Sequence, residues 1–292
     1  MIIFPIMAAI FYGTQFVPQK LAGEIKAECY NLSMILGSTI GSIVAFFICS
    51  FIIGFDELHL IPFLFSFSGG VIWSLANRFT LIGIENIGMA KSAVILNVVS
   101  VISFIFGIIF FAEIPHIFRY FGVPILILGA IIISFLTENH QKINKKGVTS
   151  VFLATIFISI NNVLTTEAII SITHPKISFF MAVMFMSFGA VCGALLFNIN
   201  PSKLREWKEQ TKKTHLFALG AGFIWLCGFE ITSFTLAEFG LTFGVPIIQS
   251  VMILVSALWG ILYFKEIEGK NKLILYVLGA AITIFGLILF IF

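Results

Sequence analysis

The sequence predicts an all-α integral membrane protein in which ten transmembrane helices form two inverted five-helix repeats. Three observations predict this fold class. The 292-residue chain is 59% hydrophobic and only 11% charged, whereas soluble domains are roughly 25% charged. Ten stretches contain no Asp, Glu, Lys or Arg, and short sequence patterns recur between the two halves. A soluble fold of this size could not bury so much apolar surface, so the surplus must face lipid.

Each uncharged stretch is interpreted as one membrane helix, because about 20 apolar residues cross the ~30 Å hydrocarbon layer. Barrel strands are excluded, since they alternate polar and apolar residues over about ten positions. The first stretch lacks a basic start and a small-residue cleavage site, which favours a retained helix over a signal peptide. The predicted spans are residues 1–19, 29–55, 58–77, 92–112, 120–137, 147–166, 177–202, 214–229, 239–264 and 273–292.

The basic residues predict how the helices are oriented. With the N-terminus outside, all 17 Lys and Arg residues except Arg119 and Lys176 fall on the cytoplasmic side. Cytoplasmic loops carry the excess of Lys and Arg in membrane proteins. Both termini are therefore expected on the extracytoplasmic face, in a multi-pass protein of the cell membrane.

An internal repeat divides the chain into residues 1–140 and 147–292, two units of one membrane domain. Trp73 in the segment GVIWSLAN and Trp225 in the segment GFIWLCGF are 152 residues apart. Other residues match at the same offset, and their order makes chance a poor explanation. These pairs are Gly37 with Gly189, Gly41 with Gly193, Gly88 with Gly240, and Asn97 with Gln249.

A unit of five helices crosses the bilayer an odd number of times, so the second unit enters from the opposite side. Inverted repeats let one site at the repeat interface open alternately to either face of the membrane. This pattern predicts a secondary transporter, with a purely structural duplication as the alternative. Gly37 and Gly41, like Gly189 and Gly193, are four residues apart and are expected to let helix backbones pack closely.

Polar side chains inside the predicted spans are the candidate substrate-binding residues. Polar groups in the hydrocarbon layer usually face the bundle interior or a cavity. Amides, hydroxyls and indole faces suit a neutral sugar or polyol, because they hydrogen-bond hydroxyls and stack on apolar ring faces. Hydrogen bonding between helices without any ligand is the alternative. The candidates are Gln15, Trp73, Asn77, Asn97, Asn161, Trp225 and Gln249, with Tyr12 and Asn162 nearby.

Carboxylates near the spans are weighed separately. Glu230 and Glu167 are candidates for ion coupling, since a buried carboxyl group there could carry a proton. Glu113 and Glu266 occupy matched positions at the ends of apolar stretches and are interpreted as structural, capping or tethering a neighbouring helix end.

Other functions find little support. The sequence contains no H-E-x-x-H, phosphate-binding loop or nucleophile elbow, so we expect no enzyme activity and no ATP-driven pump. The four cysteines show no ligand spacing, and we expect neither a cofactor nor a metal site. A net charge of +3 does not indicate a nucleic-acid partner.

Several motifs resemble those of the drug/metabolite transporter superfamily, and most closely its glucose/ribose uptake branch and the related L-rhamnose–proton symporters. They are FYGTQFVPQK at 11–20, SGGVIWSLANRF at 68–79, IGMAKS at 87–92, FGIIFFAE at 106–113, AGFIWLCGFE at 221–230, FGLTFGVPIIQS at 239–250 and WGILYFKE at 259–266. The family's W-A-x-G-N element matches at Trp73 and Asn77. In the second copy Trp225 matches, but Phe229 replaces the Asn.

The resemblance implies ten helices in two inverted units around a central cavity, with proton- or sodium-coupled uptake of a monosaccharide from outside the bilayer. Two alternatives stay open: a metabolite or drug exporter of the same fold, and a non-transporting membrane scaffold subunit.

Overall fold

The structure is a computed structural model that describes residues 2–23, 27–54, 60–87, 92, 95–134, 144–172, 177–198, 201–264 and 270–291. Within these ranges every regular element is a helix, and no strand occurs. The helices are α1 (Ile3–Thr14), α2 (Phe16–Ala22), α3 (Ala27–Ile53), α4 (Leu60–Ile87), α6 (Val98–Phe111), α7 (Ile117–Ser134), α8 (Lys145–Ile170), α9 (Ile177–Asn198), α10 (Pro201–Lys208), α11 (Lys212–Phe239), α12 (Leu241–Leu262) and α13 (Lys270–Ile291).

Seven of the described helices are long and apolar enough to cross a membrane: α3, α4, α8, α9, α11, α12 and α13. Two more, α6 and α7, are apolar but shorter. The prediction of an all-helical membrane protein is confirmed at this level. The count of ten spans stays a prediction.

The first predicted span is divided between α1 and α2. Gln15 separates the two helices but keeps helical angles, with φ −58° and ψ −22°, and its N–H donates to the Phe11 carbonyl at 3.0 Å. Pro18 has no N–H, so it cannot bond the carbonyl one turn earlier. Together α1 and α2 cover residues 3–22, which is roughly the length that a membrane span needs.

The outside of the bundle is apolar, and many polar side chains lie inside it. Phe51 is 94% exposed and Leu196 is 73% exposed, whereas Asn31 and Asn97 are 0% and 1% exposed. This distribution is the reverse of that in soluble proteins, and it suits a surface in contact with lipid tails.

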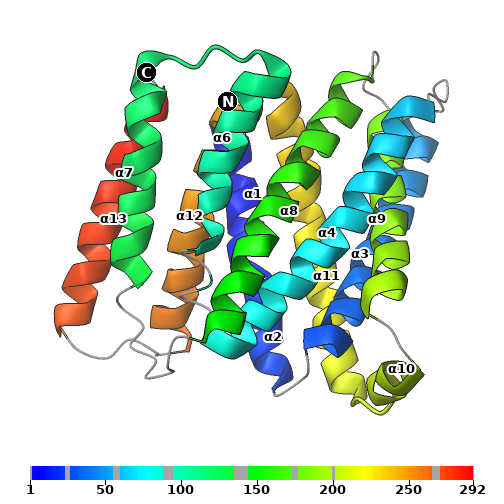
Figure 1. The fold of residues 1–292 in the computed structure, drawn as a ribbon. Coiled ribbons are helices and arrows are strands. Elements are labelled where there is room, and N and C mark those ends of the chain that lie inside the picture. Colours follow the sequence, from blue (N-terminus) through cyan, green and yellow to red (C-terminus); the bar gives the residue numbers. More distant parts are fainter. Residues whose placement is uncertain are drawn as a thin grey trace.

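The helices form one bundle in which distant segments of the chain are neighbours (Figure 1). In it, α4 packs against α8 and α9, while α11 packs against α1 and α3. Further pairs are α3 with α9, α6 with α12, and α7 with α13. The α7–α13 pair lies at one edge of the bundle and the α3–α9 pair at the other, and the two ends of the chain lie on the same side (Figure 1).

Glycines bring helix backbones into direct contact. A side chain at Gly37 in α3 would overlap the Leu219 carbonyl in α11. One at Gly189 in α9 would overlap the Phe67 carbonyl in α4, and both partners of this contact lie 152 residues from those of the first. Two further pairs of contacts match at the same offset. The contact of Gly222 with Met34 matches that of Gly70 with Met186. The contact of Gly41 with Phe223 and Leu226 matches that of Gly193 with Val71 and Ser74.

The short helix α10 is tied to α3 and α11. The Trp207 indole N–H donates to Ser33 Oγ at 2.7 Å, and Ser33 Oγ lies 2.9 Å from His215 Nδ1. Because the indole nitrogen only donates, the Ser33 oxygen accepts this bond, and Ser33 shares a second hydrogen bond with the histidine ring. Three helices therefore meet at one serine.

Glu113 caps the start of α12 from the end of α6. Its two carboxylate oxygens accept hydrogen bonds from the backbone N–H groups of Leu241 and Thr242, each at 2.8 Å. Gly240, with φ +72°, precedes the helix, and a side chain there would overlap the carboxylate. The capping role predicted for Glu113 is confirmed, and Glu266 lies outside the described residues.

Candidate functional site

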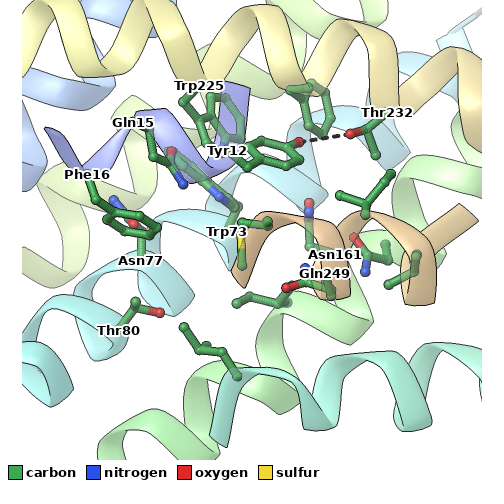
Figure 2. Close-up of a pocket in the computed structure, with 17 residues that line it drawn as sticks. Tyr12, Gln15, Phe16, Trp73, Asn77, Thr80, Asn161, Trp225, Thr232 and Gln249 are labelled. Carbon is green, nitrogen blue, oxygen red and sulfur yellow. Dashed lines mark hydrogen bonds between the residues drawn. The ribbon is translucent and has the colours of Figure 1, made fainter. Parts of the chain in front are cut away.

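A cavity opens in the middle of the bundle, where side chains from both halves of the chain converge (Figure 2). The volume open to the centres of water molecules is about 100 Å³, and one water needs roughly 10–15 Å³ on this measure. The cavity therefore has room for a small polar solute. Its walls are Tyr12, Gln15, Phe16, Trp73, Asn77, Thr80, Leu96, Ile158, Asn161, Asn162, Trp225, Phe229, Thr232, Val245, Ile248, Gln249 and Met252.

Aromatic rings form one wall of the cavity. The ring centroids of Trp73 and Trp225 are 4.0 Å apart with an angle of 30° between the planes. Trp225 also stacks on Phe229, with centroids 5.1 Å apart and an angle of 17°. Because Phe229 stands where the first half has Asn77, α4 contributes an indole and an amide to this wall, whereas α11 contributes an indole and a phenyl ring.

The Asn77 amide is held by a residue that the sequence analysis missed. Asn77 Nδ2 donates to Asn31 Oδ1 at 2.6 Å, and it lies 3.8 Å from Met34 Sδ. Asn31 is completely buried in α3. A lone amide inside an apolar stretch was the signal that could have identified it, since such groups need a partner.

Two further amides at the cavity wall have unused acceptors. Gln15 Oε1 and Asn161 Oδ1 are buried and accept no hydrogen bond from any described residue. The neighbouring Asn162 donates through Nδ2 to Ser103 Oγ at 3.2 Å. A buried acceptor without a partner costs about 1–3 kcal/mol.

Two threonines at matching positions of the halves also line the cavity and were not predicted. Thr80 Oγ1 donates to the Ala76 carbonyl at 3.0 Å, and Thr232 Oγ1 donates to the Gly228 carbonyl at 2.8 Å. Thr232 Oγ1 also lies 3.2 Å from the Tyr12 hydroxyl, as the dashed line in Figure 2 shows. Each half of the chain thus contributes a threonine hydroxyl to the cavity wall.

The structure brings together six of the seven predicted substrate-binding residues. Gln15, Trp73, Asn77, Asn161, Trp225 and Gln249 all line the cavity. Asn97 does not line it: its side chain is buried at the start of α6, where Oδ1 lies 3.1 Å from Ser100 Oγ. Whether any of these residues contacts a substrate stays a prediction.

The two carboxylates expected to couple an ion lie away from the cavity wall. Glu167 is half-buried in the last turn of α8. Glu230 lies on α11 close to the thiols of Cys49 and Cys227, and both of its carboxylate oxygens are buried without a hydrogen-bond partner among the described residues. One residue earlier, Phe229 faces the cavity, so the turn of the helix directs Glu230 toward α3 instead.

Comparisons with known proteins agree with this geometry. Residues 3–292 match the family model described as "Sugar transport protein". A Listeria monocytogenes protein named "Putative sugar uptake protein" is 24% identical over 98% of this chain and 96% of its own length. A Lactobacillus johnsonii protein of the same name is 21% identical over 95% of both chains.

A crystal structure of another protein shares the fold. Its TM-score is 0.73 at 11% sequence identity, and the alignment covers 99% of this chain and 96% of that one. The family model covers almost every residue of the bundle, including all the residues that line the cavity. The chain belongs to the sugar transport protein family.

Proposed function

We propose that this chain takes up a monosaccharide by ion-coupled alternating access and binds it in the central cavity. The observation that carries the proposal is the composition of the cavity wall. Amides, hydroxyls and indoles from α1, α4, α8, α11 and α12 face one space of about 100 Å³. Such groups provide hydrogen bonds for hydroxyls and apolar faces for a sugar ring.

We also propose that residues 1–140 and 147–292 are inverted repeats with ten crossings and both termini outside. The helix packing supports this arrangement. In it, α4 packs against α8 and α9 of the second half, and its counterpart α11 packs against α1 and α3, which are the counterparts of α8 and α9 in the first half. The glycine contacts support it as well, since they recur at an offset of 152 residues. Two units related in this way can open one shared cavity to either side.

Glu230 is the proposed proton carrier. An ionised carboxylate without a partner costs several kcal/mol in a buried position, so the neutral form suits its surroundings beside Cys49 and Cys227. Phe229 connects it to the cavity, because it is the adjacent residue of α11 and lines the wall. Loss or gain of the Glu230 proton would thus act on the helix that forms this wall.

Transport into proteoliposomes tests the proposal. Purified protein would be reconstituted and supplied with radiolabelled D-ribose, D-glucose or L-rhamnose under an imposed proton or sodium gradient. We expect accumulation of at least one sugar with one of the two gradients. Absence of both sugar binding and flux would indicate a scaffold, whereas sugar-independent efflux of amino acids or lipophilic cations would indicate an exporter.

The coupling residue is tested with Glu230→Gln, which mimics the protonated carboxyl group permanently. We expect gradient-driven accumulation to be lost while exchange of internal for external sugar continues, because exchange needs no change in protonation. Glu238→Gln is the matched control, since Glu238 lies on the same helix but is exposed. Normal accumulation by Glu230→Gln would exclude Glu230 as the proton carrier.

A further inference from the structure

The Asn77 amide is oriented by its contacts with α3. Its nitrogen lies 2.6 Å from Asn31 Oδ1 and 3.8 Å from Met34 Sδ. An asparagine amide has two N–H donors on the nitrogen and one acceptor oxygen on the other branch. Because the nitrogen faces α3 and Asn77 lines the cavity, the oxygen Oδ1 is the atom that remains for a ligand.

Thr80 presents the same kind of group beside it. Thr80 lies three residues after Asn77 on α4, on the same face of the helix, and both line the cavity. Its hydroxyl hydrogen is used in the bond to the Ala76 carbonyl at 3.0 Å, so the oxygen lone pairs are what it can offer. This end of the cavity therefore presents two acceptors, and Figure 2 shows Asn77 and Thr80 on the same side of the view.

We propose that Asn31 is a positioning residue, which holds the Asn77 amide so that Asn77 Oδ1 and Thr80 Oγ1 form a pair of acceptors for hydroxyl groups of a neutral sugar. This inference rests on the proposed function and names the part of the cavity that selects the solute. Asn31 is completely buried and does not line the cavity, so it acts through Asn77 rather than on the sugar.

The second half of the chain lacks this arrangement. At the offset of 152 residues, Val183 corresponds to Asn31 and Phe229 corresponds to Asn77. Both amides of the pair are thus replaced by apolar side chains together, as expected if each amide is needed by the other. The Asn–Asn pair therefore occurs in the first half only, which makes the two sides of the cavity chemically different and would give a bound sugar a defined orientation.

The solute groups at this end are hydroxyls and not an ammonium ion. Two hydroxyls or one ammonium ion could donate to both oxygens, but none of the described residues that line the cavity is acidic. A cation would lose its hydration without gaining an opposite charge, which is costly. A neutral hydroxyl loses much less hydration free energy on entering the cavity, and it recovers this loss through the hydrogen bond that it donates.

Three variants test the role of Asn31. Asn31→Val copies the residue of the second half and removes the acceptor, Asn31→Asp keeps an acceptor of the same size, and Val183→Ala is the matched control in α9. The measurement is sugar counterflow in proteoliposomes, with the sugar that the wild type takes up fastest, together with the thermal stability of each variant. We expect Asn31→Val to raise KM about tenfold with little change in the maximal rate. Asn31→Asp and Val183→Ala should keep the wild-type KM.

Fluorinated sugars show whether the contact is with a hydroxyl donor. A deoxyfluoro group accepts weakly but cannot donate, so fluorine at one ring position should abolish competition in the wild type. The same replacement should make little further difference in Asn31→Val, where the acceptor is already misplaced, because coupled groups are not additive.

A wild-type KM in Asn31→Val would overturn the inference, as would an Asn31→Asp variant that is stable but as impaired as Asn31→Val. Fluorine effects of equal size in the wild type and Asn31→Val would also overturn it. Failure of the wild type itself to take up any sugar would instead overturn the proposed function.

Discussion

The indole rings of Trp73 and Trp225 lie against each other with their centroids 4.0 Å apart, although 152 residues separate them in the chain. Both are buried, at 6% and 5% exposure. The contact joins α4 to α11 at the wall of the cavity, so the two halves of the chain meet there.

Replacement of Trp73 tests whether this ring contact contributes to the binding site. We expect Trp73→Phe to weaken sugar binding about fivefold, because an aromatic pair contributes roughly 0.5–1.5 kcal/mol beyond its buried area, and Trp73→Ala to weaken it further. Binding can be measured by thermal shift and membrane insertion by detergent gel filtration. Trp259→Phe is the control, since Trp259 donates to Thr14 Oγ1 and does not line the cavity. Unchanged affinity in both Trp73 variants would remove Trp73 from the site.

Two buried amides differ in their relation to the cavity, and their alanine variants should differ accordingly. Asn161 lines the cavity with an unused acceptor, whereas Asn97 is buried outside it. We expect Asn161→Ala to reduce sugar affinity roughly tenfold, as loss of a buried hydrogen bond to ligand costs about 1–1.5 kcal/mol. Asn97→Ala should affect thermal stability more than affinity. The opposite ranking in a binding titration would contradict the assignment of the cavity.

Glu113 provides a test of stability rather than of binding. Its carboxylate accepts two hydrogen bonds from the start of α12, and Glu113→Gln leaves one acceptor oxygen and removes the charge. A lost helix cap costs about 1 kcal/mol, so the melting temperature should fall by a few degrees. Glu209 is exposed and follows α10, so Glu209→Gln should leave the melting temperature unchanged. Equal melting temperatures for the two variants would contradict the capping role.

The glycine contacts give a prediction for which another glycine of the same chain serves as the control. Gly189→Ala would place a methyl group on the Phe67 carbonyl, whereas an added methyl at Gly220 meets no atom within 4 Å. We expect Gly189→Ala to destabilise the protein by about 1–3 kcal/mol through overpacking. Gly220→Ala should be neutral or stabilising, because alanine has the better helix propensity. Scanning calorimetry or thermal unfolding in detergent would measure both.

The fold was predictable where composition decides it. Long uncharged stretches, such as the one that became α12, specify membrane helices through their length and apolarity alone. The short helix α10 was not predicted, because residues 201–208 are amphipathic and charged and lie at the end of an apolar stretch. The interruption between α1 and α2 depends on Pro18, whose effect the uncharged stretch does not reveal.

The site was predictable in its residue types but not in all its partners. Gln15, Asn161 and Gln249 are polar groups in apolar segments, and the cavity contains them. Asn31 was missed because its role depends on how α3 and α4 pack, which sets the 2.6 Å contact with Asn77. Glu230 was predicted only as a candidate for ion coupling, because helix rotation decides which of two adjacent residues faces the cavity, and Phe229 does.

The contact between Trp207 and Ser33 makes α10 a link between α3 and α11. α10 is fixed to α3 by the indole and, through Ser33, to the first turn of α11 at His215. Widening the gap between α3 and α11 at this end would pull on all three side chains at once. These helices must therefore tilt together, or release α10 before they separate.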